Sequence, residues 1–103
     1  MKVREYLEHN PNPKDIDFTN LYEKGDIIYY VKVLEKLGIK ELKELKLRSI
    51  YSDMIVGVDD SSRQTVCIFL TTAQLVFKNR KEALEVYNMI SIPKVDFTEN
   101  KEE

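Results

Sequence analysis

Cysteine and histidine, the residues that build disulfide frameworks and structural zinc sites, are almost absent from this sequence. Only Cys67 and His9 occur among its 103 residues. One cysteine cannot form an intramolecular disulfide, and one cysteine with one histidine cannot fill the four positions of a protein-only zinc cage. Glycine-rich phosphate loops and the His-Glu-x-x-His zinc motif do not occur either. We therefore expect no metal, no cofactor and no enzymatic activity.

Long apolar runs are missing too. No segment approaches the roughly 20 apolar residues of a membrane-spanning helix, and the first residues lack the apolar centre of a secretory signal. The net charge of -2, from 16 basic and 18 acidic side chains, is too balanced for the whole surface to attract a polyphosphate. We expect a cytoplasmic protein without membrane contact. Cys67, inside the apolar run from Val66 to Leu70, is expected to be a reduced thiol in the core.

The sequence does contain two short segments that can anchor the N-terminal part of the chain. Val3, Tyr6 and Leu7 are spaced as on one face of a helix, which two prolines then end. A helix this short is marginal on its own, so its apolar face is expected to pack on the main domain or on a partner. A second anchoring stretch runs from Ile16 to Tyr22. Together the two segments form a leader, residues 1–23.

Alternating apolar residues predict five short strands after this leader. Residues 27–34 show a period of two, with the odd positions from Ile27 to Val33 expected to face inward. Gly38 lies in the following loop, where it can adopt a positive φ. The apolar run from Thr65 to Leu70 is typical of a strand that is covered on both faces. The expected strands are residues 27–34, 41–51, 54–58, 65–70 and 75–77.

A C-terminal helix is predicted directly after the last strand. Asn79 is a favourable N-cap, and Glu82 follows three residues later as in a capping box. Pro93 ends the helix, and residues 93–103 are expected to form a frayed acidic tail. The apolar stripe of the helix consists of Ala83, Val86, Tyr87 and Ile90.

This order of elements predicts a mainly β fold with flanking helices, in the α+β class. Five short antiparallel strands at this chain length favour a small barrel, because closure removes the exposed strand edges that promote aggregation. The barrel and the C-terminal helix are expected to occupy residues 24–92, between the leader and the tail.

Four segments of this domain carry a resemblance to a known group of proteins. They are residues 25–30 (GDIIYY), 44–51 (ELKLRSIY), 56–59 (VGVD) and 76–84 (VFKNRKEAL). In these segments the chain resembles small uncharacterised proteins carried by phages and prophages of low-GC Gram-positive bacteria. The resemblance covers roughly residues 24–90. It implies a five-stranded antiparallel SH3-like barrel with a C-terminal helix, and it implies no catalytic residues.

Two candidate chemical sites are better explained as structure. His9 lies at the frayed end of the first predicted helix, so we expect it to be solvated rather than a general base. The cluster from Asp59 to Ser62 has acidic and hydroxyl groups, but it lacks the ligand spacing of a calcium loop over about twelve residues. We interpret it as a turn.

A mildly basic hairpin is the most suggestive surface. Residues 25–51 carry six basic and four acidic side chains, a local charge of +2. Lys46 and Arg48 share one strand face with Glu44, and Lys32 is placed across from them. Charges alternate in the same way on any solvated strand face, so both interpretations stay open.

Tyr30 adds an apolar contribution to this candidate surface. It lies on the even face of the first strand together with Ile28 and Leu34. This face is too apolar to remain in water, so the N-terminal segment or a partner should cover it. The candidate partner-binding residues are Lys32, Lys43, Lys46, Arg48 and Tyr30.

These observations support one leading hypothesis and two alternatives. The leading hypothesis is a small non-enzymatic binding protein of phage or mobile-element origin that occupies a surface on a host protein. An inhibitor of a host defence system, such as an anti-CRISPR protein that blocks a CRISPR nuclease, is one form of it. The first alternative is a nucleic-acid-binding barrel that uses the basic hairpin. The second is a structural component of a virion or an oligomer assembled through the leader.

Overall fold

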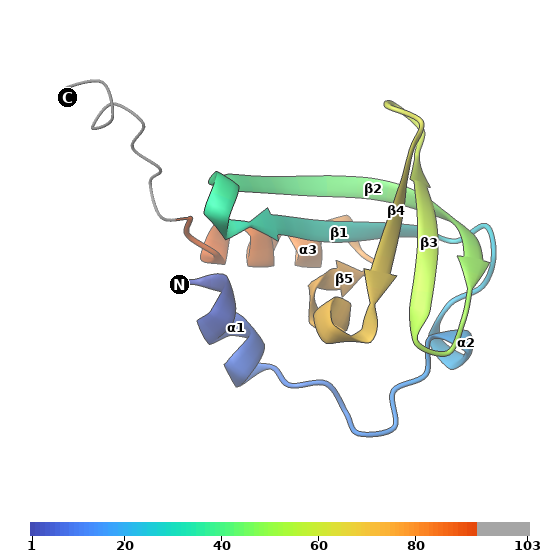
Figure 1. The fold of residues 1–103 in the computed structure, drawn as a ribbon, viewed down its shortest axis with the longest axis horizontal. Coiled ribbons are helices and arrows are strands. Elements are labelled where there is room, and N and C mark those ends of the chain that lie inside the picture. Colours follow the sequence, from blue (N-terminus) through green and yellow to red (C-terminus); the bar gives the residue numbers. More distant parts are fainter. Residues whose placement is uncertain (93–103) are drawn as a thin grey trace.

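A five-stranded antiparallel sheet forms the centre of the fold (Figure 1). The computed structural model describes residues 1–92, so the predicted helix end at Pro93 and the predicted acidic tail lie outside the described residues. In chain order the elements are α1 (Val3–His9), α2 (Phe18–Leu21), β1 (Ile27–Leu34), η1 (Glu35–Leu37), β2 (Ile39–Ile50), β3 (Met54–Asp59), β4 (Gln64–Phe69), η2 (Leu70–Leu75), β5 (Val76–Phe77) and α3 (Arg80–Met89).

The sheet is open rather than closed. Its strand order is β4-β3-β2-β1-β5, so β1 to β4 are consecutive neighbours and β5 returns to the free side of β1. β4 and β5 are the two edges, and the closed barrel expected from the sequence is not confirmed. β5 has only two residues, and η2 carries the chain from β4 to β5 without any pairing between these two edge strands. The structure shows a mixed α+β fold with five antiparallel strands and short helices.

β2 is the long strand on which the two halves of the sheet are built. Residues 39–46 pair with β1, and residues 46–50 pair with β3. The second ladder is interrupted by a β-bulge between Leu47 and Ser49. A bulge bends the strand and increases its twist. As a result, β3 and β4 run steeply across β1 and β2 (Figure 1).

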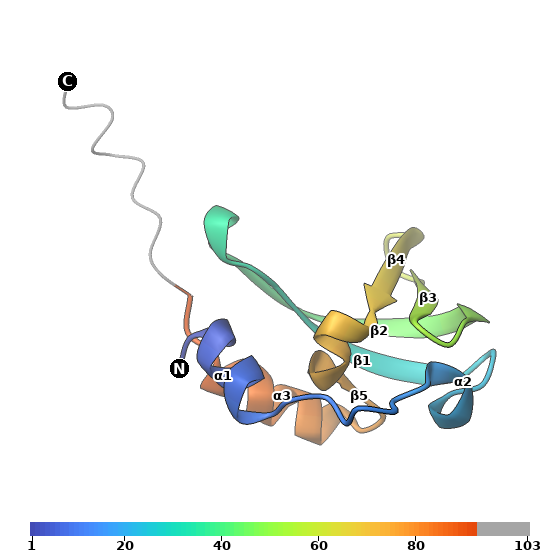
Figure 2. The same cartoon turned by 60° about the horizontal axis from the view of Figure 1, so that its bottom comes forward.

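The two faces of the sheet support two separate cores. In the first, which we name the α2 core, α2 and η2 pack against one face of β1 to β4. In the second, the α3 core, α1 and α3 lie side by side against the opposite face of β1 and β2 (Figure 2). The buried members of the α2 core are Phe18, Tyr22, Ile28, Leu45, Leu47, Ile55, Ile68, Ala73 and Val76. Those of the α3 core are Tyr6, Val31, Leu75, Ala83, Val86 and Ile90.

In β1 the odd face is buried in part, as expected, because Val31 is fully buried, but the even face is buried in part as well. Ile28, on the even face, is fully buried, whereas Ile27 is 43% exposed. Each face of β1 contributes to a different core, since Ile28 belongs to the α2 core and Val31 to the α3 core. The leader is the cause, because Phe18 and Tyr22 pack in the same core as Ile28. Of the two coverings expected for the even face, the N-terminal segment or a partner, the structure shows the N-terminal segment at Ile28, whereas Leu34 at the other end of the face is 38% exposed.

Both predicted helices form where the sequence places them. In α1 the side chain of Tyr6 is buried in the α3 core, which ties this short helix to the domain. In α3 the side chain of Asn79 caps the helix by accepting a hydrogen bond of 2.7 Å from the Lys81 N–H. Gly38 has the expected positive φ, +64°, in the loop that joins β1 to β2.

β4 differs most from its expected environment. Ile68 is buried in the α2 core, but Phe69 is 54% exposed and Cys67 is an exposed free thiol. The predicted coverage on both faces and the predicted core position of Cys67 are therefore wrong. The physical reason is the place of β4 at the edge of the sheet, where one face packs on the α2 core and no element within residues 1–92 covers the other.

Candidate functional site

A turn before β1 and the bulge in β2 bring three basic side chains together at one end of the sheet. The backbone of Gly25, with φ of +96°, donates a hydrogen bond of 2.7 Å to the carbonyl of Leu47. The N–H of Leu47 donates in turn to the carbonyl of Asp26 at 2.8 Å. These two bonds hold the turn against β2 and place Lys24 next to Lys46 and Arg48, which flank Leu47.

The three basic side chains surround a hollow of about 260 Å³. Its walls are almost wholly apolar, and Val58 of β3 contributes to them. Lys24, Lys46 and Arg48 are all exposed, and one carboxylate, that of Asp60, also reaches the hollow. We name this feature the cationic hollow. Its lining residues are Lys24, Gly25, Lys46, Leu47, Arg48, Val58 and Asp60.

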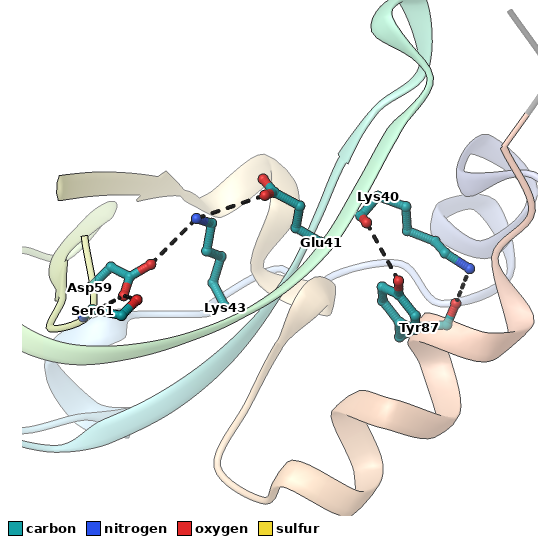
Figure 3. Close-up of polar contacts among 6 residues, drawn as sticks. All are labelled: Lys40, Glu41, Lys43, Asp59, Ser61 and Tyr87. Atoms are coloured by element: carbon teal, nitrogen blue, oxygen red, sulfur yellow. Dashed lines mark hydrogen bonds and ion pairs between the residues drawn. The ribbon is translucent and has the colours of Figure 1, made fainter. Parts of the chain in front are cut away.

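Lys43 belongs to a different arrangement, a polar cluster between β2 and the end of β3 (Figure 3). Its Nζ atom lies 3.3 Å from Oδ2 of the buried Asp59 and 3.9 Å from Oε2 of Glu41. The other oxygen of Asp59 accepts hydrogen bonds from the Ser61 N–H at 3.0 Å and from the Ser61 hydroxyl at 2.7 Å. Lys43 is thereby committed to a structural ion pair.

The same cluster sets the ionisation of Asp59. The hydrogen bond from the Ser61 hydroxyl is the main cause that lowers the pKa of Asp59 to about 2, although burial acts in the opposite direction. The Ser61 backbone N–H and the charge of Lys43 lower this pKa further. At neutral pH Asp59 is therefore a carboxylate whose bonds are all made within the chain. This arrangement explains a charged pair in a largely buried position without any ligand.

Lys40, another base of the predicted basic hairpin, is also committed to the fold. Its Nζ donates to the carbonyl of Tyr87 at 2.9 Å, near the C-terminal end of α3 (Figure 3). It also donates to the carbonyl of Ile90 at 3.0 Å. The same ammonium group lies 4.2 Å from the centre of the Tyr87 ring. A cation at this end of a helix satisfies the last carbonyls and compensates the helix dipole.

The structure separates the five predicted partner-binding residues. Lys46 and Arg48 meet at the cationic hollow, whereas Lys43 is held by Asp59. Lys32 is paired across the ladder with Glu41, and Tyr30 is paired with Lys43. Because paired residues share a face and neighbours along a strand alternate, Lys32 lies on the opposite face from Lys46. The predicted placement of Lys32 across from Lys46 is therefore wrong.

Tyr30 is half-buried and packs against both cores, so only part of its ring is accessible. The third cation at the hollow is Lys24, which we did not predict from the sequence, whereas the predicted Lys32 and Lys43 do not line it. The signal that could have found Lys24 is the turn at Gly25, since a reversal there returns Lys24 toward the next strands.

A second feature missed at the sequence level is an apolar surface on β3 and β4. Met54 is paired with Phe69, and Val56 is paired with Cys67, so these side chains share one face of the hairpin. Ile55 and Ile68 point the other way, into the α2 core. The helices pack elsewhere, α2 against the Ile55 side and α1 with α3 against β1 and β2. We name this surface the β3–β4 outer face; it consists of Met54, Val56, Val58, Cys67 and Phe69.

No protein-family model, curated protein or solved structure matches this chain. Among residues 1–92, no helix combines the length and the apolar character that crossing a lipid bilayer requires. In the same part of the chain, no three His, Cys, Asp or Glu side chains are grouped closely enough to hold a metal ion.

Proposed function

We propose that this chain is a small non-enzymatic binding protein that occupies a surface on a host protein through the β3–β4 outer face. The observation that carries the proposal is the one-sided packing of this hairpin. Its inner side chains, Ile55 and Ile68, are buried, while Phe69 on the outer side is 54% exposed. A contiguous apolar patch left in water on a small domain is typical of an interaction surface.

The outer face continues across β2 onto β1. Val58 is paired with Lys46, which is paired in turn with Ile27, and Ile27 is 43% exposed. The apolar surface therefore reaches the cationic hollow, to which Val58 also belongs. An apolar centre with charged groups at its rim is the usual anatomy of a protein–protein interface.

The phage origin and the SH3-like fold are part of the same proposal. The return of β5 to the side of β1 after the short turn η2 supports an SH3-like arrangement, since it places the first strand between the second and the last. The resemblance of residues 24–90 to phage proteins supports the origin. A phage protein that acts by covering a host surface, such as an inhibitor of a CRISPR nuclease, needs a rigid scaffold and no catalytic group.

A test of this function compares how the wild-type chain and variants of the outer face capture a partner. The tagged full chain is incubated with lysate of a low-GC Gram-positive bacterium, beside the double variant Val56→Lys and Phe69→Lys. We expect the wild-type chain to retain one partner in stoichiometric amount and the double variant to lose it. The control is Leu37→Lys, because Leu37 is 62% exposed at the tip of the β1–β2 hairpin. Absence of a stoichiometric partner, or equal retention by the double variant, contradicts the proposal.

Nucleic-acid binding is the second candidate function, and the grouping of Lys24, Lys46 and Arg48 around one hollow favours it. The commitment of Lys43 to Asp59 and the position of Lys32 on the other face weaken it. This function predicts DNA or RNA binding at about 50 mM salt that falls steeply as salt is added. Undetectable binding under that condition removes it.

A further inference from the structure

The cationic hollow has a chemistry of its own, distinct from the rest of the outer face. We propose that it binds an acidic segment of the partner protein, in which one large apolar side chain enters the hollow and flanking carboxylates pair with Lys24, Lys46 and Arg48. This inference rests on the proposed function, because it names the kind of partner surface that the β3–β4 outer face meets at this end.

Charge complementarity identifies the partner as acidic. Three exposed cations stand against one carboxylate, that of Asp60, at the hollow. Within residues 1–92 the ion pairs all involve Lys43, so Lys24, Lys46 and Arg48 form none. The chain as a whole has a net charge of -2, so the excess of positive charge at the hollow is a local feature. Carboxylates brought to it form charge-assisted hydrogen bonds with ammonium and guanidinium groups.

The shape and lining of the hollow favour an apolar side chain of the partner, which we call the anchor, between those carboxylates. A volume of about 260 Å³ accommodates one large side chain, and the walls offer it almost no polar group. Val58 connects the hollow to the outer face, so an anchor placed here is continuous with the wider apolar contact. The bonds that join Gly25 and Asp26 to Leu47 hold the hollow in shape before any partner arrives.

The same lining argues for a protein segment over a nucleic acid. Proteins that hold single strands stack the bases on aromatic side chains, and no aromatic residue lines this hollow. A phosphate backbone is also bound by longer rows of cations than the three at this site.

Synthetic peptides test the inference directly on the full chain labelled with ¹⁵N. The first probe is a nine-residue peptide with a central leucine flanked by glutamates. The second replaces the glutamates by lysines, the third replaces the leucine by serine, and the fourth probe is oligothymidylate. We expect the first peptide to shift the backbone amide signals of Lys24, Lys46 and Val58. We expect at least about tenfold weaker binding for the other two peptides.

Charge-reversal variants give the matched control. Lys46→Glu with Arg48→Glu is expected to weaken binding of the leucine–glutamate peptide by at least about tenfold. Lys36→Glu with Lys81→Glu makes the same change in net charge at two exposed positions outside the hollow, and it is expected to leave binding within about twofold of the wild type. Equal losses in the two double variants overturn the inference, because they indicate attraction by net charge alone.

Three further outcomes distinguish this inference from nucleic-acid binding and from the proposed function. If oligothymidylate shifts the same amides at lower concentration than the peptide, the hollow is a nucleic-acid site and the inference is wrong. If no peptide binds while the Val56 and Phe69 variant still loses its captured partner, the inference is wrong and the proposed function stands. If the peptide binds as expected while partner capture ignores the outer-face variant, the acidic site stands and the wider interface is wrong.

Discussion

The ammonium group of Lys43 lies 3.3 Å from the carboxylate of Asp59 (Figure 3). This contact joins β2 to the end of β3, just beyond the paired residues of the two strands. The last backbone pair of the β2–β3 ladder joins Lys46 to Val58. Beyond it, the Lys43–Asp59 pair is what connects the turn after β3 to β2. A side-chain bond therefore extends the attachment of the β3–β4 hairpin past its last β2 pair, close to the cationic hollow.

Replacement of Asp59 by Asn is expected to reduce the acid sensitivity of the fold. The pKa of Asp59 is lowered from its ordinary value of 3.8 to about 2, so its carboxylate stabilises the folded state. That contribution is complete above about pH 4 and is lost as the pH falls toward 2, because the unfolded chain takes up the proton first. Urea denaturation of the wild type and Asp59→Asn at pH 7 and pH 2.5 measures it. Parallel losses of stability in the two proteins on acidification contradict the prediction.

Gly57→Ala is expected to destabilise the sheet. An added Cβ at position 57 would lie 2.9 Å from Cβ and 3.3 Å from Cδ1 of Leu45, closer than packed side chains tolerate. We expect a loss of about 1–3 kcal/mol in the free energy of unfolding. A double-mutant cycle with Leu45→Ala supplies the control. This change removes Cδ1 at 3.3 Å but keeps the Cβ at 2.9 Å, so the cost of the new Cβ should fall only in part. A cost that is unchanged in that background contradicts the steric explanation.

Cys67 is expected to react with a thiol reagent in the native protein. It is exposed on the β3–β4 outer face, so its reaction with Ellman's reagent should need no unfolding. The native rate should stay close to the rate measured in urea. Cys67→Ser should change the free energy of unfolding by no more than about 0.5 kcal/mol, as is typical of surface positions. If Cys67 reacts only after denaturation, its side chain is buried and the prediction is wrong.

Phe18→Ala tests whether the leader is part of the folded domain. Phe18 is fully buried in the α2 core, and we expect its truncation to cost about 3–5 kcal/mol in the free energy of unfolding. Leu21→Ala on the same short helix is the matched control, because Leu21 is 40% exposed and its truncation should cost far less. Urea denaturation followed by circular dichroism measures both. Similar small effects of the two changes indicate a leader that does not dock.

The positions of the helices and strands follow from local sequence patterns. Asn79 caps α3 because its side chain reaches a backbone N–H two residues later, a contact that needs no distant partner. Gly38 turns the β1–β2 hairpin because a positive φ is easy for glycine. The predicted strands match the five that form, with small differences at their ends, because alternation and turn residues are also local signals.

Local sequence patterns identified only some residues of the candidate site. Lys46 and Arg48 were found because a basic strand face is visible in the sequence. Lys43 alternates along the same strand, but its charge is neutralised by Asp59, sixteen residues away. Lys24 reaches the hollow through a turn that binds the backbone of Leu47. The Lys43–Asp59 contact has no local signature, whereas the turn at Gly25 is a local signal for the position of Lys24.

The sequence by itself determined the five strands and the helices α1 and α3, and it excluded an intramolecular disulfide and a zinc cage of cysteine and histidine. Only the tertiary structure decided which face of each strand is buried. Alternation creates two faces with the same period, and the choice between them depends on which distant element covers one of them. Phe18 packs with Ile28, so the even face of β1 is buried there as well as the odd face at Val31. Among residues 1–92, no element covers the outer side of β4, where Cys67 and Phe69 are exposed. The surface proposed to bind a partner exists for that reason.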